Sequence, residues 1–153
     1  MSRNFLPLCW LLFLGSATTH IAAESAETLP IEVQTAQAIA DEFRARLEIA
    51  DQVFVQVVSH DRRLVSVRRS RERKDLFLLS FDQGFLTALS PEEIRAAIAH
   101  EFGHIWIFTH HPYLQTEALA NRTAMQLVSR ESLKKVYVKV TQFGGKRLEL
   151  RSD

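Results

Sequence analysis

The apolar positions of the chain follow two different periods, and these predict where helices and strands lie. From residue 31 to about residue 49 the apolar residues recur at helical spacing, which predicts a first amphipathic helix; they are Ile31, Ala38, Ile39, Phe43 and Leu47. Three apolar runs follow at 53–58, 64–67 and 76–81, and their β-branched and aromatic content predicts strands. Gly84 marks a bend after the third run.

A well-delimited helix is predicted next. Ser90 is a natural N-cap, Pro91 suits the first helical position, and Glu93 completes an S-x-x-E capping box. The helical pattern continues to about Phe108, and the sequence 109–112 then interrupts it at a proline.

Two further helical patterns complete the chain. One runs from about Tyr113 to Arg130, and another runs from 133 to 143, although "VYVKV" within it also has the composition of a strand. Gly144-Gly145 is expected to end this last helix. The order of one helix, three strands and then helices predicts a single domain of the α+β class.

The first 23 residues have a different character and are interpreted as a secretory signal peptide. Arg3 supplies a positive start, residues 5–14 form a short apolar region, and small residues follow, with cleavage expected after Ala23 or else Ala17. An uncleaved anchor is the alternative. We therefore expect an exported protein, periplasmic or secreted, whose domain spans 24–153 and has no membrane span once the signal is removed.

Composition restricts the chemistry that the mature domain can use. The chain has 153 residues, of which 46% are hydrophobic, and a net charge of +1, so no nucleic-acid partner is expected. The basic stretch 60–75 is interpreted as the solvated edge of a hairpin rather than a nucleic-acid patch. Cys9 is the only cysteine and lies in the signal, so a metal site would have to use His, Asp or Glu.

The stretch "AIAHEFGHIW", residues 97–106, contains an H-E-x-x-H motif within the capped helix. His100 and His104 are four residues apart, so both imidazoles lie on one helical face and can bind one Zn²⁺. Glu101 can reach a zinc-activated water and accept its proton as general base, and the resulting hydroxide attacks a polarised carbonyl. The alternative is a pair of core histidines beside a solvated glutamate.

A catalytic zinc needs a third protein ligand, and two residues downstream are candidates. Glu117 comes level with His104 if the two helices fold back on each other through the short link 109–112. His110 would need a sharp turn directly after the motif, where a related motif class has glycine and this chain has Ile107. We favour Glu117 and keep His110 as the alternative.

Two stretches, "FLTALSPEEIRAAIAHEFGHIW" and "TEALANRTAMQLV", resemble the gluzincin metallopeptidases, and most closely the HtpX and CAAX-prenyl-protease family. The resemblance covers about residues 76–130. It implies a minimal zincin-like domain, in which the motif helix packs against a following helix that carries the glutamate. It also implies that His100, His104 and Glu117 are zinc ligands, that Glu101 is the general base, and that the strand 76–81 lines the cleft and pairs with an extended peptide or protein substrate.

The chain departs from the family pattern at Asn121, where the family usually has an aspartate that supports a ligand histidine. The asparagine can still accept a hydrogen bond, so we expect a weaker or more exchangeable site. The usual oxyanion-stabilising region is not recognisable, and the candidates for that role are Tyr113, His111, Arg122 and Tyr137.

Three hypotheses follow from these patterns. The first is a zinc-dependent endopeptidase that uses Glu101 as base. The second is a zincin-fold metal-binding or interaction module that acts on a partner protein without turnover. The third is a metal-free protein in which the motif is accidental.

Overall fold

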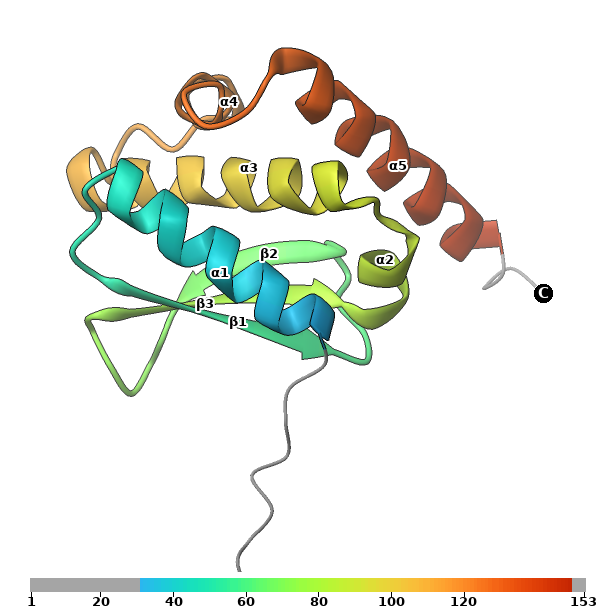
Figure 1. Ribbon diagram of the computed structural model, residues 1–153, viewed down its shortest axis with the longest axis horizontal. Helices are drawn as coiled ribbons and strands as arrows, with labels where there is room; N and C mark the ends of the chain where they lie inside the picture. Colours follow the sequence, from blue (N-terminus) through green and yellow to red (C-terminus); the bar gives the residue numbers. More distant parts are fainter. Residues whose placement is uncertain (1–30, 150–153) are drawn as a thin grey trace, which may run out of the picture.

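The computed structural model describes residues 31–149, and side chains up to residue 144 (Figure 1). The predicted signal peptide, residues 1–23, lies outside the described residues and stays a prediction. The elements in chain order are α1 (Ile31–Arg46), β1 (Gln52–Val58), β2 (Val65–Arg69), β3 (Leu76–Asp82), α2 (Gln83–Ala88), α3 (Pro91–His110), α4 (Glu117–Ala124) and α5 (Arg130–Glu149). The predicted α+β fold is confirmed.

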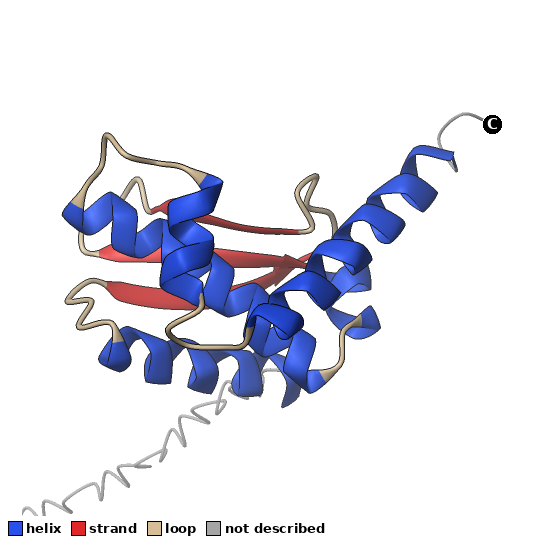
Figure 2. Cartoon of the chain, turned by 90° about the horizontal axis from the view of Figure 1, so that it is seen from above, coloured by secondary structure: helices blue, strands red, loops and turns tan. Residues whose placement is uncertain are grey.

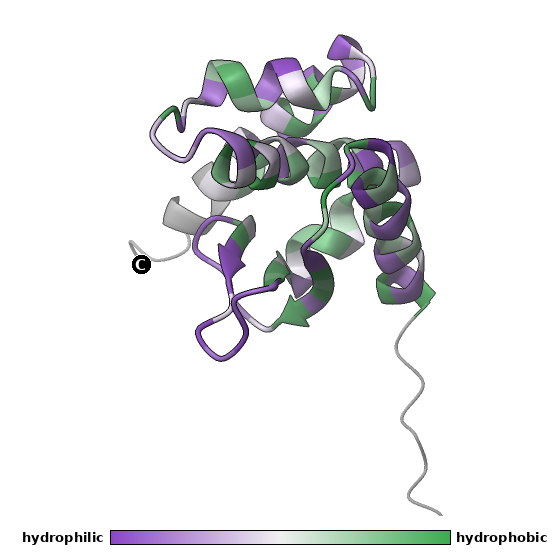
Figure 3. Cartoon of the chain, turned by 90° about the vertical axis from the view of Figure 1, so that its left-hand side faces the viewer, coloured by the Kyte–Doolittle hydropathy of each residue, from purple (hydrophilic) through white to green (hydrophobic). Residues whose placement is uncertain are grey.

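The sheet has three strands in the order β1-β3-β2. β3 pairs in parallel with β1 and antiparallel with β2, so β3 is central and β2 forms an edge. The expectation that strand 76–81 pairs with a substrate is therefore wrong, because both edges of β3 are already occupied by its neighbours. In Figure 3 the loop that joins β2 to β3 is hydrophilic, as expected for the solvated edge of a hairpin.

Helices α1 and α3 lie on the same side of the sheet and form the second layer of the domain (Figures 1 and 2). The sheet face beneath them is apolar and buried, with Val55 and Leu79 paired in register. Phe43 of α1 meets Phe102 of α3 edge to face, with ring centroids 6.0 Å apart. The core thus packs α3 against both the sheet and the neighbouring helix α1, which gives the motif helix a rigid base.

Several element boundaries differ from the prediction. Residues 83–88, expected as a bend at Gly84, form the short helix α2, because the Asp82 carboxylate accepts the backbone N–H of Phe85 at the helix start. The helix expected from Tyr113 begins only at Glu117, after the N-cap Thr116.

The last helix continues beyond its expected end. α5 passes through Gly144-Gly145 to Glu149 and also includes "VYVKV" as helix. Glycine lowers the stability of a helix but does not require it to end.

Candidate metal centre

Helix α3 carries the motif, and a capping box fixes the start of this helix. At its start the Ser90 side chain accepts the Glu93 N–H, while the Glu93 carboxylate accepts the Ser90 N–H, so the predicted capping box is present. The helix continues to His110, and Phe102 and Ile105 are buried on its core side. His100 and His104 lie on the other side, partly exposed.

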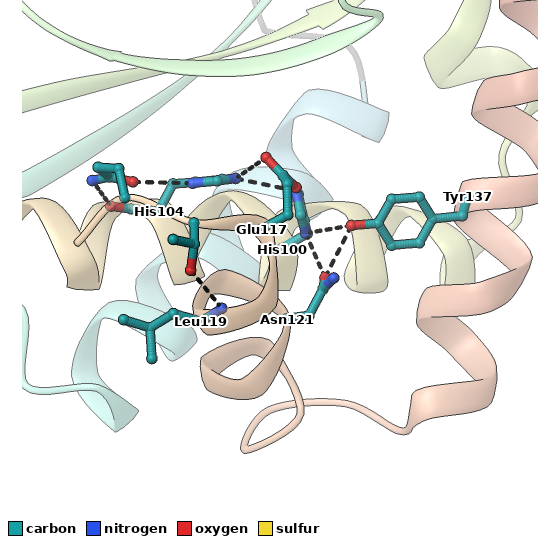
Figure 4. A network of polar contacts seen from close by, with 8 residues as sticks. His100, His104, Glu117, Leu119, Asn121 and Tyr137 are labelled. Atoms are coloured by element: carbon teal, nitrogen blue, oxygen red, sulfur yellow. Dashed lines mark hydrogen bonds and ion pairs between the residues drawn. The ribbon is translucent and has the colours of Figure 1, made fainter.

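Gly103 lets α4 approach α3 closely. A Cβ atom at this position would lie 2.3 Å from the carbonyl oxygen of Ala120, which is a steric overlap with backbone. Only glycine permits this contact without movement of α4. The close packing brings Glu117, the first residue of α4, over the two histidines of α3 (Figure 4).

Three side chains converge on one point (Figure 4). Nε2 of His100 lies 3.3 Å from Oε2 of Glu117, and Nε2 of His104 lies 3.4 Å from Oε1 of the same carboxylate. The two Nε2 atoms are 3.3 Å apart, and the candidate ligand atoms all lie within 4.8 Å of one another. Two imidazole nitrogens and one carboxylate oxygen form a donor set that suits Zn²⁺ with one position left open.

The structure does not bring His110 into this group. Its ring stacks on the indole of Trp106 with centroids 4.5 Å apart, and its Nδ1 lies 2.9 Å from the Trp106 carbonyl oxygen. The α3 helix includes His110 as its last residue, so no turn occurs that would redirect the ring toward His104.

Each histidine of the group has an amide oxygen against its other ring nitrogen. Nδ1 of His100 lies 2.9 Å from Oδ1 of Asn121, and Nδ1 of His104 lies 3.2 Å from Oε1 of Gln115. Both contacts favour a proton on Nδ1 and leave Nε2 with its lone pair. Gln115 was not predicted from the sequence, although its place two residues before Glu117 and its amide group were the available signals.

Glu101 is in a different environment from the other acidic group of the site. It is 7% exposed, whereas the side chain of Glu117 is 70% exposed. Burial, and next the negative charge of Glu117, raise the pKa of Glu101 to about 7. The charge of Arg63 and a hydrogen bond from the Val67 backbone act in the opposite direction. Burial also lowers the pKa of His100.

A cleft of about 580 Å³ is lined by His100, Glu101, His104 and Glu117, together with residues of β2 and α5. The cleft is within the size range of small-ligand and peptide side-chain sites. Among the oxyanion candidates, Tyr137 lines it, whereas His111, Tyr113 and Arg122 are exposed residues outside its lining. Within residues 31–149, no helix is long and apolar enough to cross a membrane.

A family model described as peptidase family M48 matches residues 78–151. The matched segment starts in β3 and includes α3 and α4, and therefore every member of the His100, His104 and Glu117 group. No curated protein matches the chain. Together with the convergent ligand group, the match supports a zincin-like metallopeptidase family for this protein.

Proposed function

We propose that the protein is an exported zinc-dependent endopeptidase of gluzincin type. The observation that carries this proposal is the convergence of His100, His104 and Glu117 beside the buried carboxyl of Glu101. The three converging residues would hold the ion. The M48 match gives independent support for proteolysis, and the sequence of residues 1–23 supports export.

Glu101 is the proposed general base. Zinc, when bound, acidifies a water molecule and polarises a carbonyl group. Glu101 follows His100 directly on α3, and its carboxyl, whose pKa is raised to about 7 in the metal-free site, would accept a proton from that water and return it to the leaving amine. Its burial excludes bulk water from the carboxyl group.

β2 is the strand that we propose as the substrate platform. The Ser70 N–H donates to the Leu76 carbonyl, and the Leu64 carbonyl accepts from the Asp82 N–H. The backbone N–H and C=O groups of the even-numbered residues on this strand therefore point toward β3. Val65, Val67 and Arg69 therefore direct their backbone groups toward the outer edge, which faces the cleft. An extended peptide can add to this edge as a further strand and pass Glu101.

The test is hydrolysis of an unstructured protein, such as reduced casein, by the zinc-loaded protein. Glu101→Gln is expected to keep the ion and to lower kcat by about 10²- to 10⁴-fold, the usual contribution of a positioned base. Glu131→Gln, an exposed change at the start of α5, serves as the matched control and should retain activity.

The second candidate function is a zincin-fold module that binds metal and a partner protein without turnover. The amide partner of His100, Asn121, favours this alternative, because an uncharged acceptor makes the imidazole a weaker ligand than a carboxylate does. Equal inactivity of the wild type and Glu101→Gln, both with zinc bound, would establish the module and reject the peptidase.

A further inference from the structure

Arg63 is a positively charged residue of the cleft wall that the metal site does not use. It lies just before β2 and lines the cleft together with Glu101. Burial and the charge of Glu117 raise the pKa of Glu101, and the largest opposing effect is the positive charge of Arg63. The guanidinium therefore lies within electrostatic reach of that carboxyl. Arg63 is exposed, so it is open to a ligand that enters the cleft.

Arg63 differs from the two other arginines that line the cleft. Arg69 pairs with Asp51 over 3.0 Å, and its guanidinium lies over an aromatic ring of α3, 4.9 Å from the ring centroid. Arg68 alternates with Arg69 along β2, so its side chain extends from the opposite face of the sheet, away from α3. The Arg63 guanidinium makes no ion pair with any side chain of residues 31–144. Its charge is therefore available to a ligand.

The backbone that carries Arg63 is held on both sides. The Arg63 N–H donates to the Asp61 carboxylate over 2.8 Å, and the Asp61 N–H donates to the buried Asp82 carboxylate over 3.0 Å. Leu64 follows with a φ of 69°, a left-handed conformation that is costly for leucine and persists only where the surroundings hold it. Its side chain is buried in the core, and its carbonyl accepts from the Asp82 N–H. The turn therefore fixes Arg63 beside the first outward-facing backbone groups of β2.

The position of Arg63 along the strand indicates which part of a substrate it would meet. Glu101 makes a hydrogen bond with the Val67 backbone, and Arg63 precedes Val67 by four residues, or about 13 Å of extended chain. Antiparallel pairing is the more stable arrangement of two strands. A peptide that adds to β2 in this direction has its carboxyl-terminal side at Arg63. A carboxylate there can accept two parallel hydrogen bonds from the guanidinium.

The acidic groups near Arg63 do not occupy this position. Glu101 and Glu117 lie in the same cleft, and a bound zinc ion would offset their negative charge. The Asp61 carboxylate accepts hydrogen bonds from the Arg63 N–H and from the hydroxyl of Ser66. In the zinc-loaded protein, the start of β2 would therefore attract an anionic group of the substrate.

We infer that Arg63 is a specificity-determining residue, which binds a carboxylate of the substrate on the carboxyl-terminal side of the cleaved bond. The inference rests on the proposed peptidase and on β2 as its substrate platform. The carboxylate can come from an acidic side chain or from the free carboxyl terminus of a peptide. The chemistry is the same in both cases, and experiment distinguishes the two sources.

Cleavage-site analysis tests the inference with random-sequence decapeptides, prepared once with a free carboxyl terminus and once as the amide. On the carboxyl-terminal side of the cleaved bond, the zinc-loaded wild type is expected to select aspartate and glutamate over asparagine and glutamine. The expected factor is about two- to fivefold, the range of an exposed ion pair. If the terminal carboxylate is the ligand, the free-acid peptides are instead cleaved faster than the amides by a similar factor. Arg63→Gln should remove the selection, and added salt should weaken it in the wild type.

Arg62→Gln is the matched control, because Arg62 is an exposed neighbour outside the cleft lining, and this variant should keep the selection. Arg63→Glu should shift the selection toward lysine and arginine. Each preference is a ratio measured within one variant, so a change in overall rate does not affect it. The inference is overturned if the wild type shows no selection in either set of peptides, or if Arg63→Gln retains it.

A binding measurement separates this inference from the proposed function. The same peptides are passed over immobilised, zinc-loaded Glu101→Gln protein, and the retained fraction is sequenced. Peptides with the preferred carboxylate should be enriched, and the enrichment should disappear when Arg63→Gln is added. An active wild type without the selection rejects the inference alone. An inactive wild type whose Glu101→Gln form shows Arg63-dependent retention rejects the peptidase and keeps the carboxylate site.

Discussion

At the scale of single residues, the histidines of the motif are partnered by uncharged amides, and the ionisable group of greatest consequence is Glu101. Its carboxyl is buried beside Glu117 and makes a hydrogen bond with the Val67 backbone. One hydrogen bond and the charge of Arg63 do not offset the cost of burial, so the charged form is disfavoured. In the absence of metal, the site therefore contains a carboxyl group whose charged form is destabilised.

This destabilisation predicts a pH-dependent difference between the metal-free wild type and Glu101→Gln. The pKa of this carboxyl is about 7 in the folded protein, against an ordinary value of 4.5. The free energy of unfolding of the wild type therefore falls as the pH rises between these two values. Glu101→Gln should therefore be more stable than the wild type above pH 7, by on the order of 3 kcal/mol. Near pH 4 the two proteins should differ by less. Urea unfolding at pH 4, 6 and 8 measures the difference, and a gap that is constant across this range would contradict the assignment.

At the scale of elements, the placement of Glu117 depends on how closely α4 packs against α3. Gly103 and Ala120 meet backbone to backbone, and the short helix α4 begins directly at the glutamate, with Thr116 as its cap. A glycine in the middle of a helix normally lowers its stability. Here the absence of a side chain permits the contact on which the ligand geometry depends.

Gly103→Ala is expected to destabilise the protein by about 1–3 kcal/mol, because the new methyl group would overlap the Ala120 carbonyl and displace α4. Zinc affinity should fall as well, since Glu117 moves with α4. Gly144→Ala is the matched control: nothing lies within 4 Å of its added Cβ, so α5 should gain up to about 1 kcal/mol. Thermal unfolding and a zinc titration of both variants provide the comparison. A Gly103→Ala protein with unchanged zinc affinity would show that α4 need not approach so closely.

At the scale of the whole molecule, the proposed ion would link α3 to α4 at a point that α5 also reaches through Tyr137. Such a link exists only in the folded state, because the ligands come from separate helices. Binding of zinc should therefore be coupled to the stability of the domain.

Zinc is accordingly expected to raise the melting temperature, and a chelator should reverse the change. At a free zinc concentration of 100 times Kd the gain is about 2.7 kcal/mol, which corresponds to a shift of several degrees. His104→Ala should abolish the shift, whereas His110→Ala should keep it, because His110 stacks on Trp106 away from the ligand group. Differential scanning calorimetry measures the effect. If zinc no longer raised the melting temperature of His110→Ala, His110 would have to be a zinc ligand after all.

Local interactions allowed much of this protein to be predicted from its sequence alone. The capping box at Ser90 and the four-residue spacing of His100 and His104 depend only on neighbours within one or two helical turns. The three strands and the α+β class followed from the apolar periods in the same way. Patterns of this kind are visible in the sequence because the contacts they describe are close along the chain.

Contacts between distant segments were decided by the tertiary structure. The sheet order placed β3 in the centre and gave the cleft edge to β2, since pairing partners are chosen by packing across the whole core rather than by the composition of one strand. The approach of α4 at Gly103 set Glu117 over the histidines, and the path of α5 brought Tyr137 to Asn121. No local pattern specifies these positions, because each depends on how separate helices pack in space.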